Sequence, residues 1–243
     1  MTSPRQMNDG NPARAQRVAD EKIYDNADFF DVPKEYFELI YGEIQNRLGA
    51  PESLLDIGCA NGAFLHHAGR LFPDAKRQGL EPVALLADRA AQSLPNADVF
   101  QGGLFDDIPG VHAAQAVTMM SVIGIFDDPA QVVRRLLSLC SPNGLVFLFS
   151  PFNEEPIDVI LSYRRSPGGI WESGYNLFSM TTMEDVCSTL GLNCSWKDFA
   201  LQQPIAKGDD PMRSWTEPFH DKENCIIYGT NTFCTPKRLV IER

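Results

Sequence analysis

Long apolar runs are missing from this chain, although 44% of its 243 residues are hydrophobic. No stretch approaches the ~18 residues that a membrane-spanning helix needs. The first residues, 1–20, are polar and contain no apolar h-region, so no secretory signal is expected. We therefore expect a flexible tail over 1–18, followed by a single cytoplasmic domain over 19–243.

Closely spaced cysteine pairs and basic clusters are also missing. None of the six cysteines forms a Cys-x-x-Cys pair, so no metal site is expected, while a pairing of Cys225 with Cys234 stays open. The formal net charge is −11, and basic residues occur only as isolated pairs such as Arg134-Arg135. Such a chain would repel a phosphate backbone. We expect a small-molecule substrate, no nucleic-acid or membrane partner, and a monomer or homodimer.

One glycine-containing segment is the most informative part of the sequence. An apolar run ends at Asp56, Gly58 and Gly62 follow, and a stretch of helical spacing begins at Phe64. Such a strand, tight loop and helix bring main-chain N–H groups to a polar ligand. Glu81 follows at the end of the next expected strand, where α/β sheets bind ribose hydroxyls. Because Ala60 breaks the Gly-x-Gly-x-x-Gly pattern, a nucleoside with a charged tail is favoured over a dinucleotide.

This segment resembles the cofactor signature of class I S-adenosylmethionine-dependent methyltransferases, and the resemblance runs from about Ser53 to Pro151 and more loosely to the C-terminus. It implies an α/β, Rossmann-like fold. The expected sheet is seven-stranded and mostly parallel, with helices on both faces and an antiparallel last strand. The implied cofactor is S-adenosyl-L-methionine, and the product is S-adenosyl-L-homocysteine.

The resemblance also implies a set of cofactor contacts. Glu81 is expected to accept hydrogen bonds from both ribose hydroxyls, since a carboxylate matches a vicinal diol. An N-terminal helical lid over 19–49 is expected to place Tyr24 over the cofactor. The expected cofactor-binding residues are Asp56, Gly58, Cys59, Ala60, Asn61, Gly62, Glu81, Pro82, Leu104, Phe105, Met120, Ser121 and Tyr24.

The chain departs from the family at two places. Gly103 stands where members commonly carry an acid for the adenine amino group. Asp106 or Asp107 is a possible substitute for this acid. The Leu104 amide, with Phe105 packed on the adenine, is another possibility. The remaining alternative leaves Phe105 in the core. A buried strand is expected over 117–123, and after it Gly124 and Ile125 replace the family's Glu and His. A histidine base from that position is therefore absent.

Two insertions, over 152–178 and 203–224, are expected to cover the substrate. The alternative for the first insertion is a structural or dimer-forming loop. Trp215 is either a substrate contact or a packing residue. No catalytic residue is singled out; the weak candidates for a base are His220 and His67, beside Asp106 and Glu155. The candidate substrate contacts are Tyr163, Arg164, Trp171, Tyr175, Arg213 and Trp215.

The sequence thus predicts an S-adenosylmethionine-dependent methyltransferase that transfers a methyl group to oxygen or nitrogen of a small molecule, such as a glycan or secondary-metabolite intermediate. One alternative is a degenerate methyltransferase that binds the cofactor and acts as a regulator or scaffold. An NAD-dependent reductase is the second alternative, and it lacks the third glycine of its fingerprint.

Overall fold

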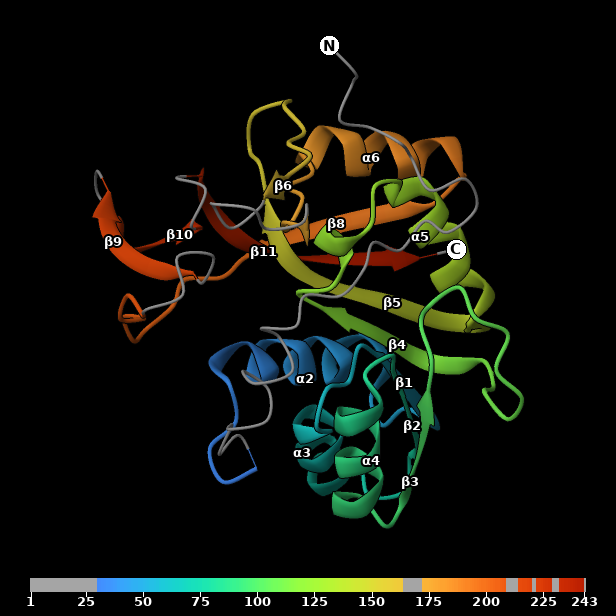
Figure 1. Cartoon of the computed structure of the whole chain (residues 1–243). Helices are drawn as coiled ribbons and strands as arrows, with labels where there is room; N and C mark the ends of the chain where they lie inside the picture. Colours follow the sequence, from blue (N-terminus) through green and yellow to red (C-terminus); the bar gives the residue numbers. More distant parts are fainter. Residues whose placement is uncertain (1–29, 164–171, 209–213, 220–221, 229–231, 243) are drawn as a thin grey trace.

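A computed structural model of the chain describes residues 30–163, 172–208, 214–219, 222–228 and 232–242. Five parallel strands form the first half of the sheet, in the spatial order β3-β2-β1-β4-β5 (Figure 1). Their carboxyl ends therefore meet at one edge, where α/β sheets bind ligands. The strands are β1 (Ser53–Ile57), β2 (Lys76–Glu81), β3 (Ala97–Gln101), β4 (Ala114–Met120) and β5 (Cys140–Phe152).

The second half of the sheet is built around the long strand β11 (Thr232–Glu242), which runs antiparallel to β5. β8 (Asn193–Asp198) pairs with the other side of β11 and completes the expected seven strands. The prediction of a mostly parallel sheet with an antiparallel last strand is confirmed. The first residues of β11 also pair with β10 (Lys222–Tyr228), which pairs with β9 (Trp215–Phe219), so the sheet is longer than expected. Cys225 on β10 is a free thiol, and the side chain of Cys234 lies outside the described residues.

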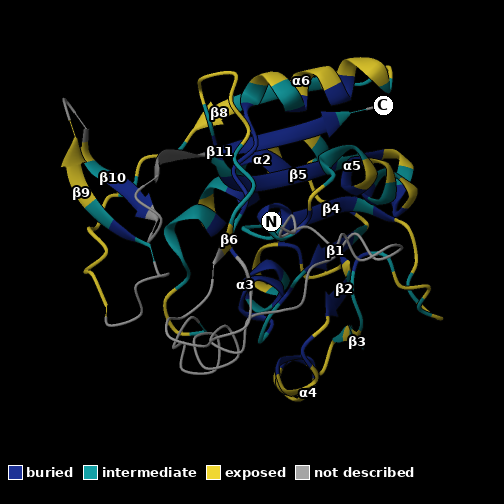
Figure 2. Ribbon diagram, turned by 45° about the horizontal axis from the view of Figure 1, so that its top comes forward, coloured by how far each residue is buried: buried dark blue, intermediate teal, exposed yellow. Residues whose placement is uncertain are grey.

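Helices cover both faces of the sheet, and each face has its own hydrophobic core. One core joins the sheet to α5 (Pro129–Ser138) and α6 (Met180–Thr189). The other joins it to α2 (Glu35–Leu48), α3 (Ala63–Leu71) and α4 (Ala84–Ser93). The central strands β1, β2, β4 and β5 are buried along most of their length (Figure 2), as expected for a sheet covered on both faces.

The expected strand over 117–123 is wrong at its end. β4 stops at Met120, Ser121 has a φ of 58°, and a 3-10 turn, η1, occupies Ile123–Ile125. The apolar residues continue past the strand because this turn is packed as closely as the strand, and Ile123 is 2% exposed. A positive φ is costly for a residue with a Cβ, so the surrounding structure fixes this bend at the carboxyl edge of the sheet.

The first expected insertion packs against residues that flank the second. Leu177, from the first, and Ile226, next to the second, share a small hydrophobic cluster with Val159 and Leu201. The first insertion also contains a short hairpin of β6 (Ser162–Tyr163) and β7 (Glu172–Ser173). Both segments lie beyond the end of β5, on the side of the molecule that carries β9 and β10 (Figure 1). Over the described ranges, no helix is both long and apolar enough to cross a membrane.

Candidate functional site

The loop between β1 and α3 has a tightly bent backbone. Gly58, Ala60 and Gly62 have φ values of 74°, 49° and 88°. A Cβ on Gly58 would lie 2.6 Å from Val122, and one on Gly62 would lie 2.5 Å from Leu94, so neither position accommodates a side chain. The N–H groups of Gly58 and Cys59 donate to the carbonyl of Leu80 at 2.7 and 3.0 Å, which ties the loop to β2. The loop thus forms a narrow cradle beside the end of β2.

Glu81 supports this loop from the end of β2. Its side chain is buried, and Oε2 accepts a hydrogen bond from the Ala60 N–H at 2.9 Å. Oε1 accepts from the Val83 N–H at 3.0 Å. Because the two oxygens of a carboxylate offer about four lone-pair positions, each oxygen keeps acceptor capacity for a ligand. Glu81 can therefore position the loop and bind a diol at the same time.

Asp56, at the end of β1, is the second buried carboxyl group of the site. Its Oδ1 accepts a hydrogen bond from the Thr118 hydroxyl at 2.7 Å. Burial raises the pKa of Asp56 to about 7; the hydrogen bond from Thr118 opposes this rise, the negative charge of Glu81 adds to it, and Lys34 opposes it least. A carboxyl group in this position ionises more readily when a cation lies beside it. The site therefore favours a ligand that carries positive charge.

Cys59 and Asn61 contribute structure to the loop. The Cys59 thiol is buried against Gly79, where a Cβ would lie 2.7 Å from the sulfur, and burial raises its pKa well above the ordinary value. Such a thiol is a poor nucleophile. The Asn61 side chain accepts a hydrogen bond from the Ala63 N–H at 3.3 Å, at the start of α3. Both residues shape the loop, and a ligand would meet its backbone.

Phe105, in the segment after β3, is half-buried at the margin of the core. Its ring packs edge-on against Phe126, with centroids 5.5 Å apart, and Leu104 is buried in the same core. Arg135 donates to the carbonyls of Leu104 and Asp106, both at 2.9 Å. These contacts favour the core position given above as the alternative, and packing of Phe105 on adenine stays a prediction.

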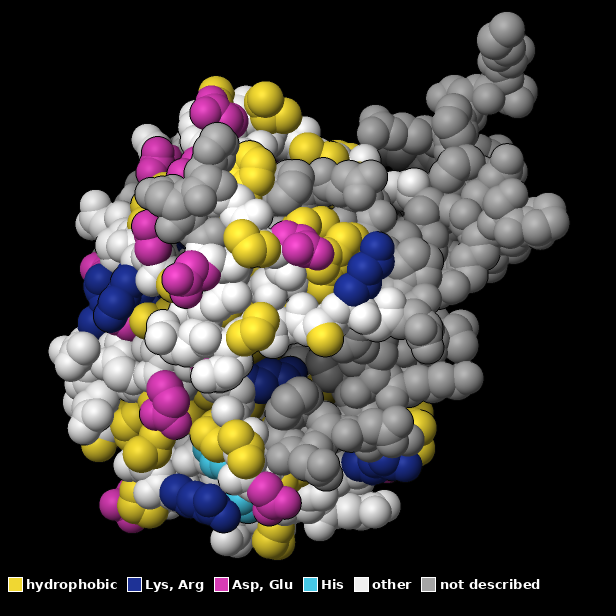
Figure 3. Space-filling model, turned by 90° about the vertical axis from the view of Figure 1, so that its left-hand side faces the viewer, with side chains coloured by type: hydrophobic (Ala, Val, Ile, Leu, Met, Phe, Trp, Pro, Cys, Tyr) yellow, Lys and Arg dark blue, Asp and Glu magenta, His cyan; other side chains and the backbone are white. Residues whose placement is uncertain are grey.

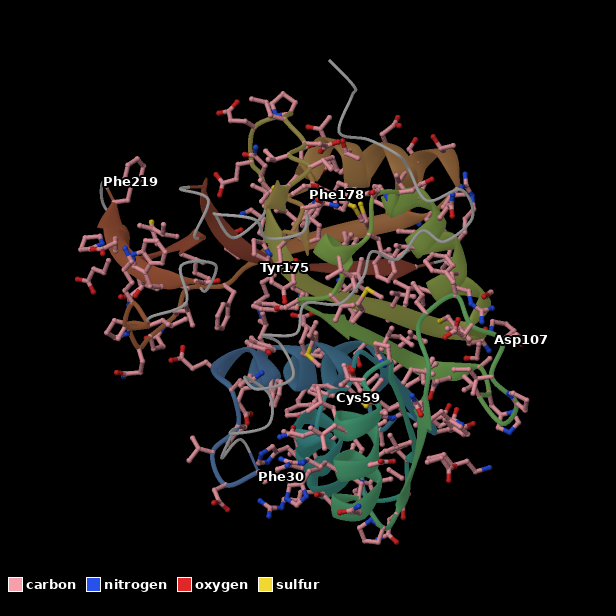
Figure 4. All side chains as sticks on the ribbon, in the orientation of Figure 1. Phe30, Cys59, Asp107, Tyr175, Phe178 and Phe219 are labelled. Carbon is pink, nitrogen blue, oxygen red and sulfur yellow. The ribbon has the colours of Figure 1, made fainter. Side chains whose placement is uncertain are left out.

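Asp106 turns back toward Gly103, the position where the family acid is missing. Its Oδ2 accepts a hydrogen bond from the Gly103 N–H at 2.8 Å and would lie 3.6 Å from a Cβ at Gly103. Asp107 lies farther along the same loop, well away from Cys59 (Figure 4). Of the two acids, Asp106 is the one whose carboxylate stands at the end of β3.

The remaining expected cofactor contacts lie at or beside the same edge. Pro82 is exposed directly after Glu81, and Met120 is half-buried at the end of β4. The Ser121 N–H donates to the carbonyl of Phe149 at 2.6 Å, which couples the bend after β4 to the end of β5. Tyr24 lies outside the described residues.

The first insertion docks on the turn that follows β4. The N–H of Asn176 donates to the carbonyl of Gly124 at 2.7 Å, and its side-chain amide donates to the carbonyl of Phe126 at 2.6 Å. The Asn176 side-chain oxygen accepts from the Leu161 N–H at 2.9 Å. A Cβ on Gly124 would lie 2.7 Å from the Asn176 carbonyl oxygen. The insertion thus occupies space beside Gly124, the family's Glu position, and no sequence pattern predicted this role for Asn176.

Replacing Gly124 with alanine is expected to loosen this docking, because the added methyl group collides with the backbone of Asn176. Hydrogen exchange of the Asn176 and Leu177 amides should become about 10-fold faster or more, as expected for a loss of ~1.4 kcal/mol in local stability. The matched control is Gly42→Ala in α2, where nothing lies within 4 Å of the new methyl group. Unchanged exchange in Gly124→Ala would contradict the docking described here.

The candidate substrate residues do not all gather at one place. Tyr175, labelled in Figure 4, belongs to the first insertion, and its Cβ lies 3.5 Å from the position that a Cβ on Gly124 would take. Trp215 is buried in β9, its Nε1–H donates to Glu217 at 3.2 Å, and Lys207 lies 4.5 Å from its ring. That strand is at the far edge of the sheet, so Trp215 has the packing role given above as its alternative (Figure 1). The backbone of Tyr163 forms β6, and its side chain is outside the described residues, as are Arg164, Trp171, Arg213 and His220.

His67 is buried between α2 and α3. It is 7% exposed, and its ring lies 6.5 Å from that of Phe37 and 5.3 Å from that of His66. Glu155 is exposed in the first insertion. Among the described residues, no group of three or more His, Cys, Asp or Glu side chains is arranged to hold a metal ion.

The bent loop, Glu81 at the end of the next strand and the sheet order with one antiparallel strand define a class I S-adenosylmethionine-dependent methyltransferase. The methyltransferase domain family matches residues 20–195, which is more than half of the chain. The chain belongs to this family. The chain therefore carries a methyltransferase domain.

Individual methyltransferases resemble the chain in sequence or in fold. The malonyl-[acyl-carrier protein] O-methyltransferase of Halalkalibacterium halodurans is 30% identical over 115 residues, which are 43% of this chain and 41% of that protein. The match therefore spans less than half of this curated relative. DesVI of Streptomyces venezuelae has a TM-score of 0.56 at 16% identity, covering 94% of this chain and 99% of DesVI. Coclaurine N-methyltransferase, bound to N-methylheliamine and S-adenosylhomocysteine, has a TM-score of 0.57 at 12% identity, with 81% of this chain and 62% of that chain covered.

Proposed function

We propose that the chain transfers a methyl group to a carboxylate oxygen or an amine nitrogen of a small molecule. The observation that carries this proposal is the first insertion, docked on the turn after β4 through Asn176. It gives the site a cover next to the carboxyl edge of the sheet, and a loop on a rigid scaffold commonly provides specificity. The alternative of a degenerate, regulatory methyltransferase remains an outcome of the test below.

The residues at the sheet edge fit the cofactor. The positive φ values of Gly58 and Gly62 bend the loop tightly beside the end of β2, and a carboxylate such as Glu81 can accept from ribose hydroxyls as well as from the Ala60 N–H. Asp106 supplies a carboxylate beside Gly103, where it would accept from the adenine amino group. The Asp56 carboxyl group favours the positively charged end of the cofactor. The other proposed contacts are those of Gly58, Cys59, Ala60, Asn61, Gly62, Pro82, Leu104, Met120 and Ser121.

The positions of three base candidates support this acceptor class, while the fourth, His220, lies outside the described residues. His67 is packed between helices, Asp106 is bonded to the Gly103 N–H, and Glu155 is exposed. Within the described residues, none of these three is suited to remove a proton from a buried acceptor. A carboxylate or a neutral amine attacks without losing a proton first, whereas an alcohol needs a base. Two of the similar proteins, the malonyl-[acyl-carrier protein] O-methyltransferase and coclaurine N-methyltransferase, are consistent with both acceptor atoms.

When bound, S-adenosylmethionine supplies a methyl group already activated by a sulfonium. The protein's contribution is then to bind, align and shield the reactants. Glu81 and the loop fix the position of the ribose, and Tyr175 and the docked insertion cover the edge of the site where an acceptor would enter. Holding the reacting atoms in line can supply a large part of the rate enhancement.

The molecular surface supports a small acceptor. On the described part of the face in Figure 3, basic side chains stand among acidic and hydrophobic ones and form no continuous stripe. The formal net charge of the chain is −11. A nucleic-acid substrate would need a joined basic surface to neutralise its phosphates.

The test is a transfer assay with methyl-labelled S-adenosylmethionine and a panel of small carboxylic acids, amines and alcohols, with bulk protein and RNA as comparison acceptors. We expect label in carboxylates or amines. Mild alkali separates the two, because it releases a methyl ester as methanol and leaves an N-methyl group in place. Label in alcohols, protein or RNA alone would contradict the proposal. Cofactor binding with no transfer to any acceptor would favour the regulatory alternative.

A further inference from the structure

Three aromatic rings meet at the point where the pairing of β4 with β5 ends. Tyr36 stacks on Phe149, with ring centroids 4.4 Å apart and an angle of 11° between the rings. Phe199, which directly follows β8, packs edge-on against Phe149 at 5.2 Å and against Tyr36 at 6.5 Å. The first turn of α2, the strand β5 and the segment after β8 each contribute one ring to this cluster.

The aromatic cluster adjoins the site described above. Phe149 lies opposite Met120, the last residue of β4, and its carbonyl accepts the hydrogen bond from the Ser121 N–H. Met120 packs against the same hydrophobic core as the three rings. The cluster therefore belongs to the carboxyl edge of the sheet, where open α/β sheets bind ligands.

Glu35 holds the segment after β8 against the start of α2. Its two carboxylate oxygens accept hydrogen bonds from the backbone N–H groups of Gln202 and Gln203, at 2.7 and 3.0 Å. Hydrogen bonds to a carboxylate are stronger than those between neutral groups. From β10, the side-chain amide of Asn224 donates to the carbonyl of Leu201 at 2.9 Å. The segment that carries the third ring is therefore held between α2 and β10.

The three rings differ in how far they are buried. Phe149 is 4% exposed, whereas Tyr36 and Phe199 are half-buried, so part of each of these two rings reaches the surface. An aromatic ring that packs edge-on or offset against another gains more than the burial of its area alone supplies. The half-buried rings therefore favour an aromatic group over an aliphatic group of the same size.

We propose that Phe199 and Tyr36 form an aromatic wall of the acceptor site, and that the acceptor carries an aromatic ring next to its carboxylate or amine. Glu35 is a positioning residue, because it acts by holding the segment of Phe199 in place. This inference deepens the proposed function and rests on it.

The experiment uses two pairs of acceptors that differ only in the ring: phenylacetate with cyclohexylacetate, and benzylamine with cyclohexylmethylamine. Transfer of labelled methyl groups is measured as kcat/KM for the wild-type chain and for Phe199→Leu, which keeps an apolar side chain and removes the ring. The wild-type chain should prefer the phenyl member of a pair by roughly 3- to 10-fold, as expected for one ring contact. Phe199→Leu should lose most of this preference through a higher KM, with an unchanged dissociation constant for S-adenosylhomocysteine. A purely structural defect would weaken both members of a pair equally.

Further variants test the role of Glu35 and provide a matched control. Glu35→Ala should raise the KM of the phenyl acceptor, and Glu35→Gln, which keeps one oxygen acceptor, should recover part of that loss. Phe219→Leu removes an exposed ring from β9, at the far edge of the sheet, and should keep the whole preference. Equal use of the phenyl and cyclohexyl members, transfer only to acceptors without a ring, or an unchanged preference in Phe199→Leu would overturn the inference. Transfer to no acceptor at all, the panel above included, would instead contradict the proposed function.

Discussion

Replacing Glu81 with alanine is expected to weaken binding of S-adenosylhomocysteine by about 100-fold or more. The change removes the proposed acceptor for the ribose hydroxyls and also the acceptor of the Ala60 and Val83 N–H groups. A hydrogen bond to a charged group contributes about 1.5–3 kcal/mol, and this carboxylate makes several. Calorimetric titration measures the loss directly.

Two variants control for effects unrelated to the ligand. Asp98→Ala removes an exposed carboxylate from the neighbouring strand β3 and should leave the dissociation constant unchanged. Glu81→Gln keeps one oxygen acceptor and should fall between alanine and the wild-type chain. Wild-type affinity in Glu81→Ala would show that this residue does not bind the cofactor.

Replacing Asp56 with asparagine is expected to stabilise the folded chain at alkaline pH and to weaken cofactor binding. Burial, with Glu81, raises the pKa of Asp56 to about 7, whereas an unfolded aspartate titrates near ~3.9. The folded state therefore binds the proton more tightly. The stability that this proton contributes is fully present below about pH 4 and is lost as the pH rises through about 7. Asparagine is neutral throughout and keeps an oxygen for the Thr118 hydroxyl.

The expected gain for Asp56→Asn is on the order of 2–4 kcal/mol at about pH 8.5 and close to zero below about pH 4. Thermal unfolding of both chains at the two pH values measures it. S-adenosylmethionine should bind the variant more weakly at alkaline pH, because the negative charge facing its cationic end is gone. Equal destabilisation at both pH values would contradict the account of Asp56. A gain in stability together with weaker cofactor binding would show that the buried charge of Asp56 destabilises the fold and strengthens binding of a cationic ligand.

The parts of the fold and site that could be predicted from sequence are those set by neighbouring residues. The bends at Gly58 and Gly62 follow from a local glycine pattern, and Glu81 follows at the end of the next strand. The number of strands and the antiparallel last strand came through the resemblance to a family. The end of β4 was misplaced because Val122 and Ile123 are as apolar as the strand before them, and nothing in that pattern marks the positive φ of Ser121.

Contacts between distant segments could not be predicted. Asn176 bonds to Phe126 across a sequence separation of 50 residues, and no local pattern connects the two. Tyr36 stacks on Phe149 of β5 and Phe37 packs on Phe64 of α3, and no local pattern marks either contact. Trp215, which the sequence offered as a substrate contact, is instead buried in an extension of the sheet. Substrate residues are the hardest to predict because insertions take their positions from tertiary packing.

The most direct test of the central claim, that the glycine loop and Glu81 form an S-adenosylmethionine site, is calorimetric titration of the purified wild-type chain with S-adenosylhomocysteine and, separately, with NADH. We predict saturable binding of S-adenosylhomocysteine at a single site with micromolar affinity, and no binding of NADH. A folded chain that binds NADH, or that binds neither ligand, would contradict the account.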